Sequence, residues 1–176
     1  MEDLKYPIGK FKKPEMISAE TKKEWIEVIR LLPEKLEKAV ERLTEDQLET
    51  TYRPFGWTIR QVIHHVADSH MNSFIRFKLA LTEDDPAVKM YKEDKWAELP
   101  DVLAVDPVFS LQLLKGLHAR WVHLLEGLTE EEFKRGFYHP EWKAVIPLDV
   151  TLALYAWHSE HHLAHVTNLI KRMGWG

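Results

Sequence analysis

The chain has 176 residues and a net charge of −4, with 45% apolar and 30% charged residues. These values are ordinary for one soluble globular domain, and the mixed charges argue against a nucleic-acid partner. Cysteine is absent, which excludes disulfides and cysteine-based zinc sites. No stretch approaches the ~18 apolar residues that span a membrane, and the N-terminus lacks an apolar signal segment. We therefore expect a cytoplasmic protein with no membrane partner.

The first part of the chain predicts an arm followed by a long helix. Residues 1–17 show little periodicity and are expected to form an extended arm that packs on the body or on a partner. From Ser18, apolar residues recur every three or four positions, which is typical of a helix. Pro33 lacks an N–H group, so we expect a kink or break near Leu31–Leu32. A capping box at Thr44–Gln47 predicts a short helical turn.

A second long helix is expected to begin at the capping box Thr58–Gln61 and to end at the acidic stretch before Pro86. The connection at residues 83–105 is long for a linker, which suggests a crossover or a wall of a site. Asp106-Pro107 is a good start for a third helix.

The last third of the chain predicts one more long helix. A capping box at Thr129–Glu132 opens a short helix, and residues 137–147 suggest a small hairpin or an extended loop. The final helix is expected from about Leu148 to Met173, with Gly174 as its terminator. Together these elements predict a single all-α domain over residues 1–176, a four-helix bundle with a long crossover connection and short extra helices.

Histidines are concentrated near the C-terminus, where residues 157–165 hold four of the ten. His158 and His162 are four residues apart, so on a helix they project within about 40° of each other. Two such imidazoles can both reach one metal ion at about 2.0–2.1 Å. The zinc-protease motif H-E-x-x-H has the same spacing, but Ser159 stands where its glutamate general base would be.

A second pair with the same spacing, His161 and His165, is an alternative. The polarity of the two helix faces favours His158 and His162 as the inward pair, because their face continues with mostly apolar residues. The apolar face carries Thr151, Tyr155, Val166 and Leu169, whereas the other carries Trp157, Asn168 and Arg172.

A two-histidine pair does not complete a metal site, so a third ligand must come from elsewhere. The candidates are His64, His65, His70, His118, His123, His139 and the carboxylates. His64 and His65 lie among apolar residues of the second helix, and neighbouring helical positions point about 100° apart, so one of the two can face the core. Spacing leaves the choice open. We interpret His70, His118, His123 and His139 as core or exposed histidines.

Two segments resemble the histidine motifs of a known family. Residues 56–73, GWTIRQVIHHVADSHMNS, resemble the first histidine motif of the DinB/YfiT-like superfamily, and residues 157–165, WHSEHHLAH, are similar to its second. Three further segments resemble its YfiT branch: Tyr6–Gly9, Phe137–Pro140 and Arg172–Trp175.

The resemblance implies a four-helix bundle, a homodimer and one divalent metal ion per subunit. It implies His65 as the third ligand beside His158 and His162. Zinc is the metal that we expect first and nickel second. Asp68, three residues after His65, is a candidate to hold a ligand imidazole by a hydrogen bond.

The function implied is that of a metal-dependent hydrolase acting on a small-molecule substrate, since three protein ligands leave positions open for water. Relatives in the superfamily include thiol-dependent transferases, so a metal-dependent S-transferase using a low-molecular-weight thiol such as bacillithiol is the alternative. A bundle that the metal only stabilises is a third reading. No catalytic residue beyond the ligands can be named from the sequence.

Overall fold

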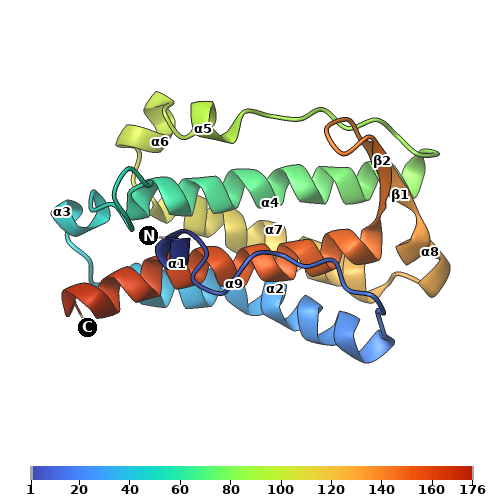
Figure 1. Ribbon diagram of the computed structural model, residues 1–176, viewed down its shortest axis with the longest axis horizontal. Coiled ribbons are helices and arrows are strands. Elements are labelled where there is room, and N and C mark those ends of the chain that lie inside the picture. The colour runs from blue at the N-terminus through green and yellow to red at the C-terminus, as the bar shows by residue number, and fades with distance from the viewer. Residues whose placement is uncertain (1, 176) are drawn as a thin grey trace.

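The computed structural model describes residues 2–175, and its centre is a bundle of four long helices (Figure 1). They are α2 (Ala19–Val40), α4 (Ile59–Thr82), α7 (Val108–Glu126) and α9 (Leu148–Met173). Helix α2 packs against α7 and α9, and α4 packs against the same two helices, so α2 and α4 are diagonally opposed. The predicted four-helix bundle is confirmed. None of the helices in the described part is long and apolar enough to cross a membrane.

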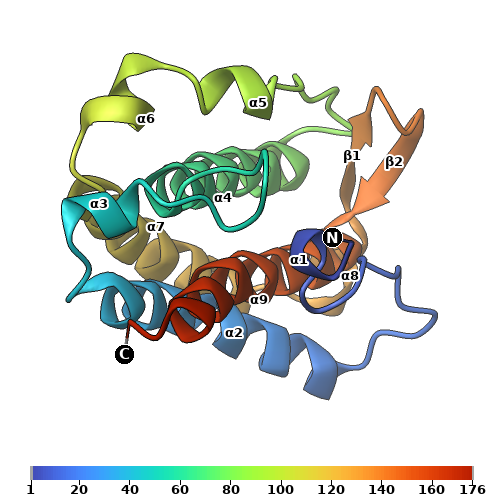
Figure 2. The same cartoon turned by 60° about the vertical axis from the view of Figure 1, so that its left-hand side comes forward.

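The connection at residues 83–105 returns the chain along α4, so that α4 and α7 run in the same direction (Figures 1 and 2). It contains two short helices, α5 (Glu93–Trp96) and α6 (Pro100–Ala104). Two side chains at the start of α4 hold this connection in place. Gln61 donates to the carbonyl of Ala97 at 2.9 Å, and Arg60 donates to the carbonyl of Val105 at 2.9 Å. The expected crossover is therefore a strap fixed to the N-terminal end of α4.

The predicted helix starts agree with the structure. Thr58 caps α4 and Gln61 returns the capping-box hydrogen bond. The same arrangement opens the short helices α3 (Glu45–Leu48) and α8 (Glu130–Lys134). Helix α9 ends at Gly174, whose φ of 70° lies in the left-handed region that glycine tolerates best.

Residues 136–147 form the small hairpin that the sequence suggested. Strand β1 (Gly136–His139) pairs with the antiparallel strand β2 (Ala144–Pro147), in a register that places Tyr138 opposite Val145. The hairpin leads directly into α9, at the end of the bundle away from α3 (Figure 1).

Two expectations about the N-terminal part need correction. Of the kink or break expected near Leu31–Leu32, the break does not occur, because helix α2 continues through Pro33, which is buried on its packed face. Packing of this face against α7 and α9 outweighs the local cost of the proline. The arm is also not wholly extended, because it begins with a one-turn helix, α1 (Glu2–Lys5). It then runs along α9, where Trp157 Nε1 donates to the carbonyl of Gly9 at 3.1 Å.

The interior consists of two apolar clusters separated by polar side chains. One cluster, near the hairpin, includes Phe77, Trp121 and Leu152. The other, near α3, includes Leu36 and Ile63. Between them lies a group that we call the polar layer, made of Ser69, His70, His118 and His158.

Candidate metal centre

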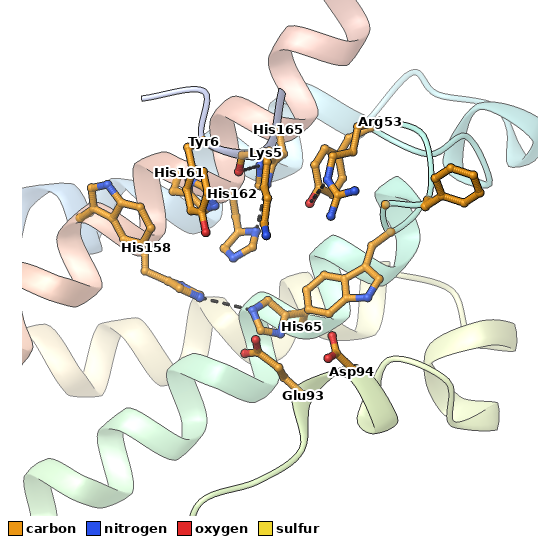
Figure 3. A pocket seen from close by; sticks show the side chains of 15 residues that line it. Lys5, Tyr6, Arg53, His65, Glu93, Asp94, His158, His161, His162 and His165 are labelled. Carbon is orange, nitrogen blue, oxygen red and sulfur yellow. Dashed lines mark hydrogen bonds between the residues drawn. The ribbon is translucent and has the colours of Figure 1, made fainter. Parts of the chain in front are cut away.

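The structure brings three of the histidines together, one of which, His158, belongs to the polar layer (Figure 3). His65 comes from α4, and His158 and His162 come from successive turns of α9. One nitrogen of each ring lies within 4.8 Å of one nitrogen of the other two. The Nε2 atoms of His65 and His158 are 3.3 Å apart.

This geometry fits a metal ion. Two imidazole nitrogens bound to one ion at about 2.0–2.1 Å with tetrahedral angles are separated by about 3.3–3.4 Å. The separation between His65 Nε2 and His158 Nε2 is 3.3 Å. His162 can join the set, because one of its ring nitrogens lies within 4.8 Å of those of His65 and His158.

The three imidazoles are neutral at neutral pH, as ligands must be. Burial lowers the pKa of His65 to about 3, with a smaller effect from the nearby His161 and His165. Burial also lowers the pKa of His158 and of His162 well below the ordinary value. Their nitrogen lone pairs are therefore free of protons that an ion would have to displace.

A second group of histidines shares His162. His161, His162 and His165 also bring one nitrogen each within 4.8 Å of the others. His165 is already committed, because its Nε2 donates to the carbonyl of Lys5 at 3.1 Å and its ring stacks on Tyr52 with centroids 3.9 Å apart. The Nδ1 atom of His161 is buried without a hydrogen-bond partner among residues 2–175.

A cavity of about 550 Å³ opens onto both histidine groups. Its walls come from the arm, the loop before α4, the start of α5 and the face of α9. The loop contributes Trp57, whose ring centroid lies 4.5 Å from that of His65. Cationic side chains stand on one side, Lys5 and Arg53, and acidic ones on another, Glu93 and Asp94 (Figure 3).

Several sequence-based assignments can be compared with these positions. His161 and His165 were expected on the more polar, outward face, but both are buried because the arm covers them. Glu160, just before His161, is not among the residues that line the cavity and pairs with Lys35 at 3.2 Å. Asp68 was a candidate to hold a ligand imidazole, but within residues 2–175 no hydrogen bond joins its carboxylate to a histidine. Burial instead raises the pKa of Asp68 to about 6, assisted by the nearby Asp101.

The remaining histidines have separate surroundings. His64 points to a different side of α4 from His65, where its ring nitrogens lie 2.7 Å from Ser110 Oγ and 3.1 Å from the Val105 carbonyl. His123 is exposed, and His139 stacks on Trp142 in the hairpin. His70 and His118 are buried core residues, as interpreted from the sequence, but they hydrogen-bond to each other at 3.0 Å and are part of the polar layer.

The sequence did not single out the cavity walls. Tyr91 and Trp96, two aromatic residues of the 83–105 connection, pack on each other with ring centroids 4.6 Å apart. Glu93 and Asp94, between them in the chain, line the cavity instead. The only available signal was the unusual length of the 83–105 connection, which indicates a wall without identifying its residues.

The fold and the histidine site together define the class of protein. A family model described as the DinB superfamily matches residues 21–166, and the chain belongs to this family. It is 57% identical over 173 residues to the Bacillus subtilis protein YfiT, which carries the provisional name of a metal-dependent hydrolase, covering 98% of this chain and 97% of YfiT. A Bacillus cereus relative with the same provisional name is 54% identical over 176 residues, covering 99% of this chain and all of that protein.

Solved structures agree with the fold. The structure of YfiT from Bacillus subtilis, described as having an unusual four-helix bundle topology, superimposes with a TM-score of 0.96 at 56% identity and covers 99% of both chains. A mycothiol-dependent maleylpyruvate isomerase superimposes with a TM-score of 0.65 at 16% identity, over 82% of this chain and 60% of that one. This second likeness concerns the fold alone.

Proposed function

We propose that the protein is a metal-dependent hydrolase of small molecules and that His65, His158 and His162 hold its divalent ion. The observation that supports this most is the convergence of three neutral imidazoles at the wall of a 550 Å³ cavity. Three protein ligands leave coordination positions open toward that cavity, which is the arrangement of catalytic rather than structural sites. The provisional names of YfiT and its Bacillus cereus relative agree with this proposal.

Different side chains of the protein have different roles around the proposed ion. A bound divalent ion would supply Lewis acidity, polarising a substrate oxygen or activating a water molecule. Trp57, packed on His65, restricts the movement of that ligand. Lys5 and Arg53 offer positive charge to one part of a substrate, and Glu93 and Asp94 offer negative charge to another. A small polar substrate that carries both charges matches this cavity best. Zinc remains the metal that we expect first, because it accepts imidazole ligands and an open position.

Metal analysis of protein purified without a histidine tag tests the first half of the proposal. We expect one zinc ion per chain in the wild type and its loss in His65→Ala. The matched control is His123→Ala, which removes an exposed histidine of α7 and should keep the ion. Substoichiometric metal in the wild type, together with unchanged thermal stability on adding a chelator, would contradict the metal site.

Hydrolysis of a panel of small esters and amides tests the second half. Activity should require the ion, disappear in His65→Ala and persist in His123→Ala. A thiol S-transferase would use the same open positions, so each variant should also be assayed with a low-molecular-weight thiol and the electrophile monochlorobimane. Metal-dependent conjugation of the thiol without hydrolysis would favour the assignment as a thiol S-transferase over that as a hydrolase. A bound ion with neither activity would favour a bundle that the metal only stabilises.

A further inference from the structure

One buried carbonyl of α2 lacks its usual helical donor. In an α-helix the carbonyl of residue i accepts from the N–H of residue i+4, and four residues after Ile29 stands Pro33, which has no N–H. The Nδ1 atom of His118, on α7, lies 2.6 Å from the Ile29 oxygen. Because a carbonyl oxygen can only accept, His118 carries its proton on Nδ1.

The proton position on His118 determines the one on His70. Burial lowers the pKa of His118 to about 4, so the ring is neutral and has a single N–H. Its Nε2 atom is therefore an acceptor. The Nδ1 atom of His70 lies 3.0 Å from this Nε2 and must be the donor.

The proton position on His70 in turn determines the one on His158 at the candidate metal centre. His70 is fully buried, and within the described part of the chain its two ring nitrogens contact only the imidazoles of His118 and His158, so no opposite charge could balance a cation and its ring is also neutral. With the proton of His70 on Nδ1, its Nε2 accepts from the Nδ1 atom of His158 at 3.1 Å. His158 then has no proton on Nε2, the atom that faces His65 (Figure 3).

We propose that His70 and His118 are positioning residues of the metal centre, which fix His158 in the tautomer whose bare Nε2 points at the ion. This proposal rests on the three-histidine site proposed above and extends it by two residues that do not touch the ion. A hydrogen bond to the outer nitrogen of a ligand histidine fixes the ring orientation and raises its basicity. We call His158, His70 and His118 the imidazole chain; it starts on α9 and ends at the α2 carbonyl.

His162, the other proposed ligand on α9, has a shorter series of hydrogen bonds that run in the same donor-to-acceptor direction. His165 donates from Nε2 to the Lys5 carbonyl, so its Nδ1 is an acceptor. The Nδ1 atom of His162 lies 3.4 Å from it, which leaves the Nε2 of His162 without a proton. Both α9 histidines thus have their outer nitrogen directed at another histidine, and both arrangements end at a backbone carbonyl: directly through His165 for His162, and through His70 and then His118 for His158. This repetition supports a positioning role for the imidazole chain.

Histidine tautomers can be measured directly in the metal-free wild type. Multiple-bond proton–nitrogen NMR correlation on protein labelled with nitrogen-15 at histidine distinguishes Nδ1–H from Nε2–H rings. We expect Nδ1–H for His158, His70 and His118 near neutral pH. An Nε2 proton on His158 in the metal-free wild type would overturn the proposal. This readout depends neither on metal binding nor on catalysis, so it stands even if the hydrolase assignment fails.

Two variants of His118 test the positioning role. His118→Phe keeps a ring but removes both nitrogens, and we expect zinc affinity to fall about 10–100-fold and Nε2–H to appear on His158. His118→Gln retains an oxygen that can accept from His70, and it should recover much of the affinity. His123→Phe, the same substitution at an exposed position of α7, is the matched control.

Zinc affinity is measured by competition with a chelating dye, and folding is checked by circular dichroism and urea denaturation. Should His118→Phe fail to fold, the positioning role is still tested by the zinc affinity of His118→Gln relative to the wild type and by the histidine tautomers of the wild type. Wild-type zinc affinity and an unchanged His158 tautomer in a folded His118→Phe protein would also overturn the proposal.

Discussion

His158 shows how one residue serves two neighbours. Its Nε2 faces His65 at 3.3 Å, and its Nδ1 contacts His70 at 3.1 Å. The i,i+4 spacing was sufficient to predict the pair on α9, because both histidines lie on one helix. Contacts between helices are not encoded in spacing, so the sequence indicates His70 and His118 only as core or exposed histidines. Residue spacing also left His64 and His65 open, and the family resemblance made that choice.

The two histidine groups at the cavity make different predictions for metal stoichiometry. If the ion lies among His65, His158 and His162, His65→Ala loses zinc while His161→Ala retains one ion per chain. If instead the ion lies among His161, His162 and His165, His161→Ala loses zinc while His65→Ala retains one ion per chain. Elemental analysis after dialysis measures both variants. We expect the first pattern, because His165 is already bonded to the Lys5 carbonyl.

The lowered histidine pKa values predict an acid-sensitive fold in the metal-free protein. His65 has a folded pKa of about 3 and His118 of about 4, against about 6.5 when unfolded. The unfolded state binds more protons in this range, so stability is complete above about pH 6.5 and falls as the pH decreases, by up to about 1.4 kcal/mol per pH unit for each such group. Urea denaturation at a series of pH values measures this. A midpoint that stays constant from about pH 7 to about pH 5 would contradict the prediction.

At the scale of elements, the sequence was most informative where local chemistry decides the structure. Capping boxes at Thr44, Thr58 and Thr129 each marked a helix start, and Gly174 marked the end of α9. The break expected at Pro33 does not occur, because there the packing between helices decides the structure and not the local chemistry. The proline rule is local, whereas α2 is held by its packing against α7 and α9, and His118 satisfies the carbonyl that the proline leaves free.

The capping box of α4 gives a prediction for one element. Thr58→Ala removes the hydroxyl that accepts from the Gln61 N–H at 3.2 Å, and we expect a loss of about 1 kcal/mol in the free energy of unfolding. Gln61 also holds the strap over α4 through Ala97. Chemical denaturation measures the loss, and Thr58→Ser, which retains the hydroxyl, is the control. A Thr58→Ala protein as stable as the control would contradict the role of the cap.

At the scale of the whole molecule, the bundle and its long return connection were predictable, and the cavity was not. Four amphipathic stretches and one long connection determine the architecture. The cavity walls depend on how the arm, the loop before α4 and α5 meet around α9. These segments are short and irregular, so no periodic pattern places them relative to one another.

The homodimer stays a prediction, and the structure offers one surface for it. Apolar side chains are exposed along α6 and the start of α7: Leu99, Leu103, Val105, Val108, Phe109 and Leu113. Phe109 is 61% exposed, and a cluster of this kind is typical of an interface. We expect the wild type to be a dimer by light scattering and Phe109→Glu to be a folded monomer. Ile75→Glu, which changes an exposed apolar residue outside this group, should leave the dimer intact.

The polar layer also restricts how the four helices can align during folding. Its hydrogen bonds link α9 to α4, α4 to α7, and α7 to α2. A slip of one helix by a single turn, about 5.4 Å, would move an imidazole into one of the apolar clusters and leave its neighbours unpaired. Each buried polar group left without a partner costs about 1–3 kcal/mol. The histidines between the two apolar clusters therefore favour one register of the bundle over all neighbouring ones, whether or not an ion is bound.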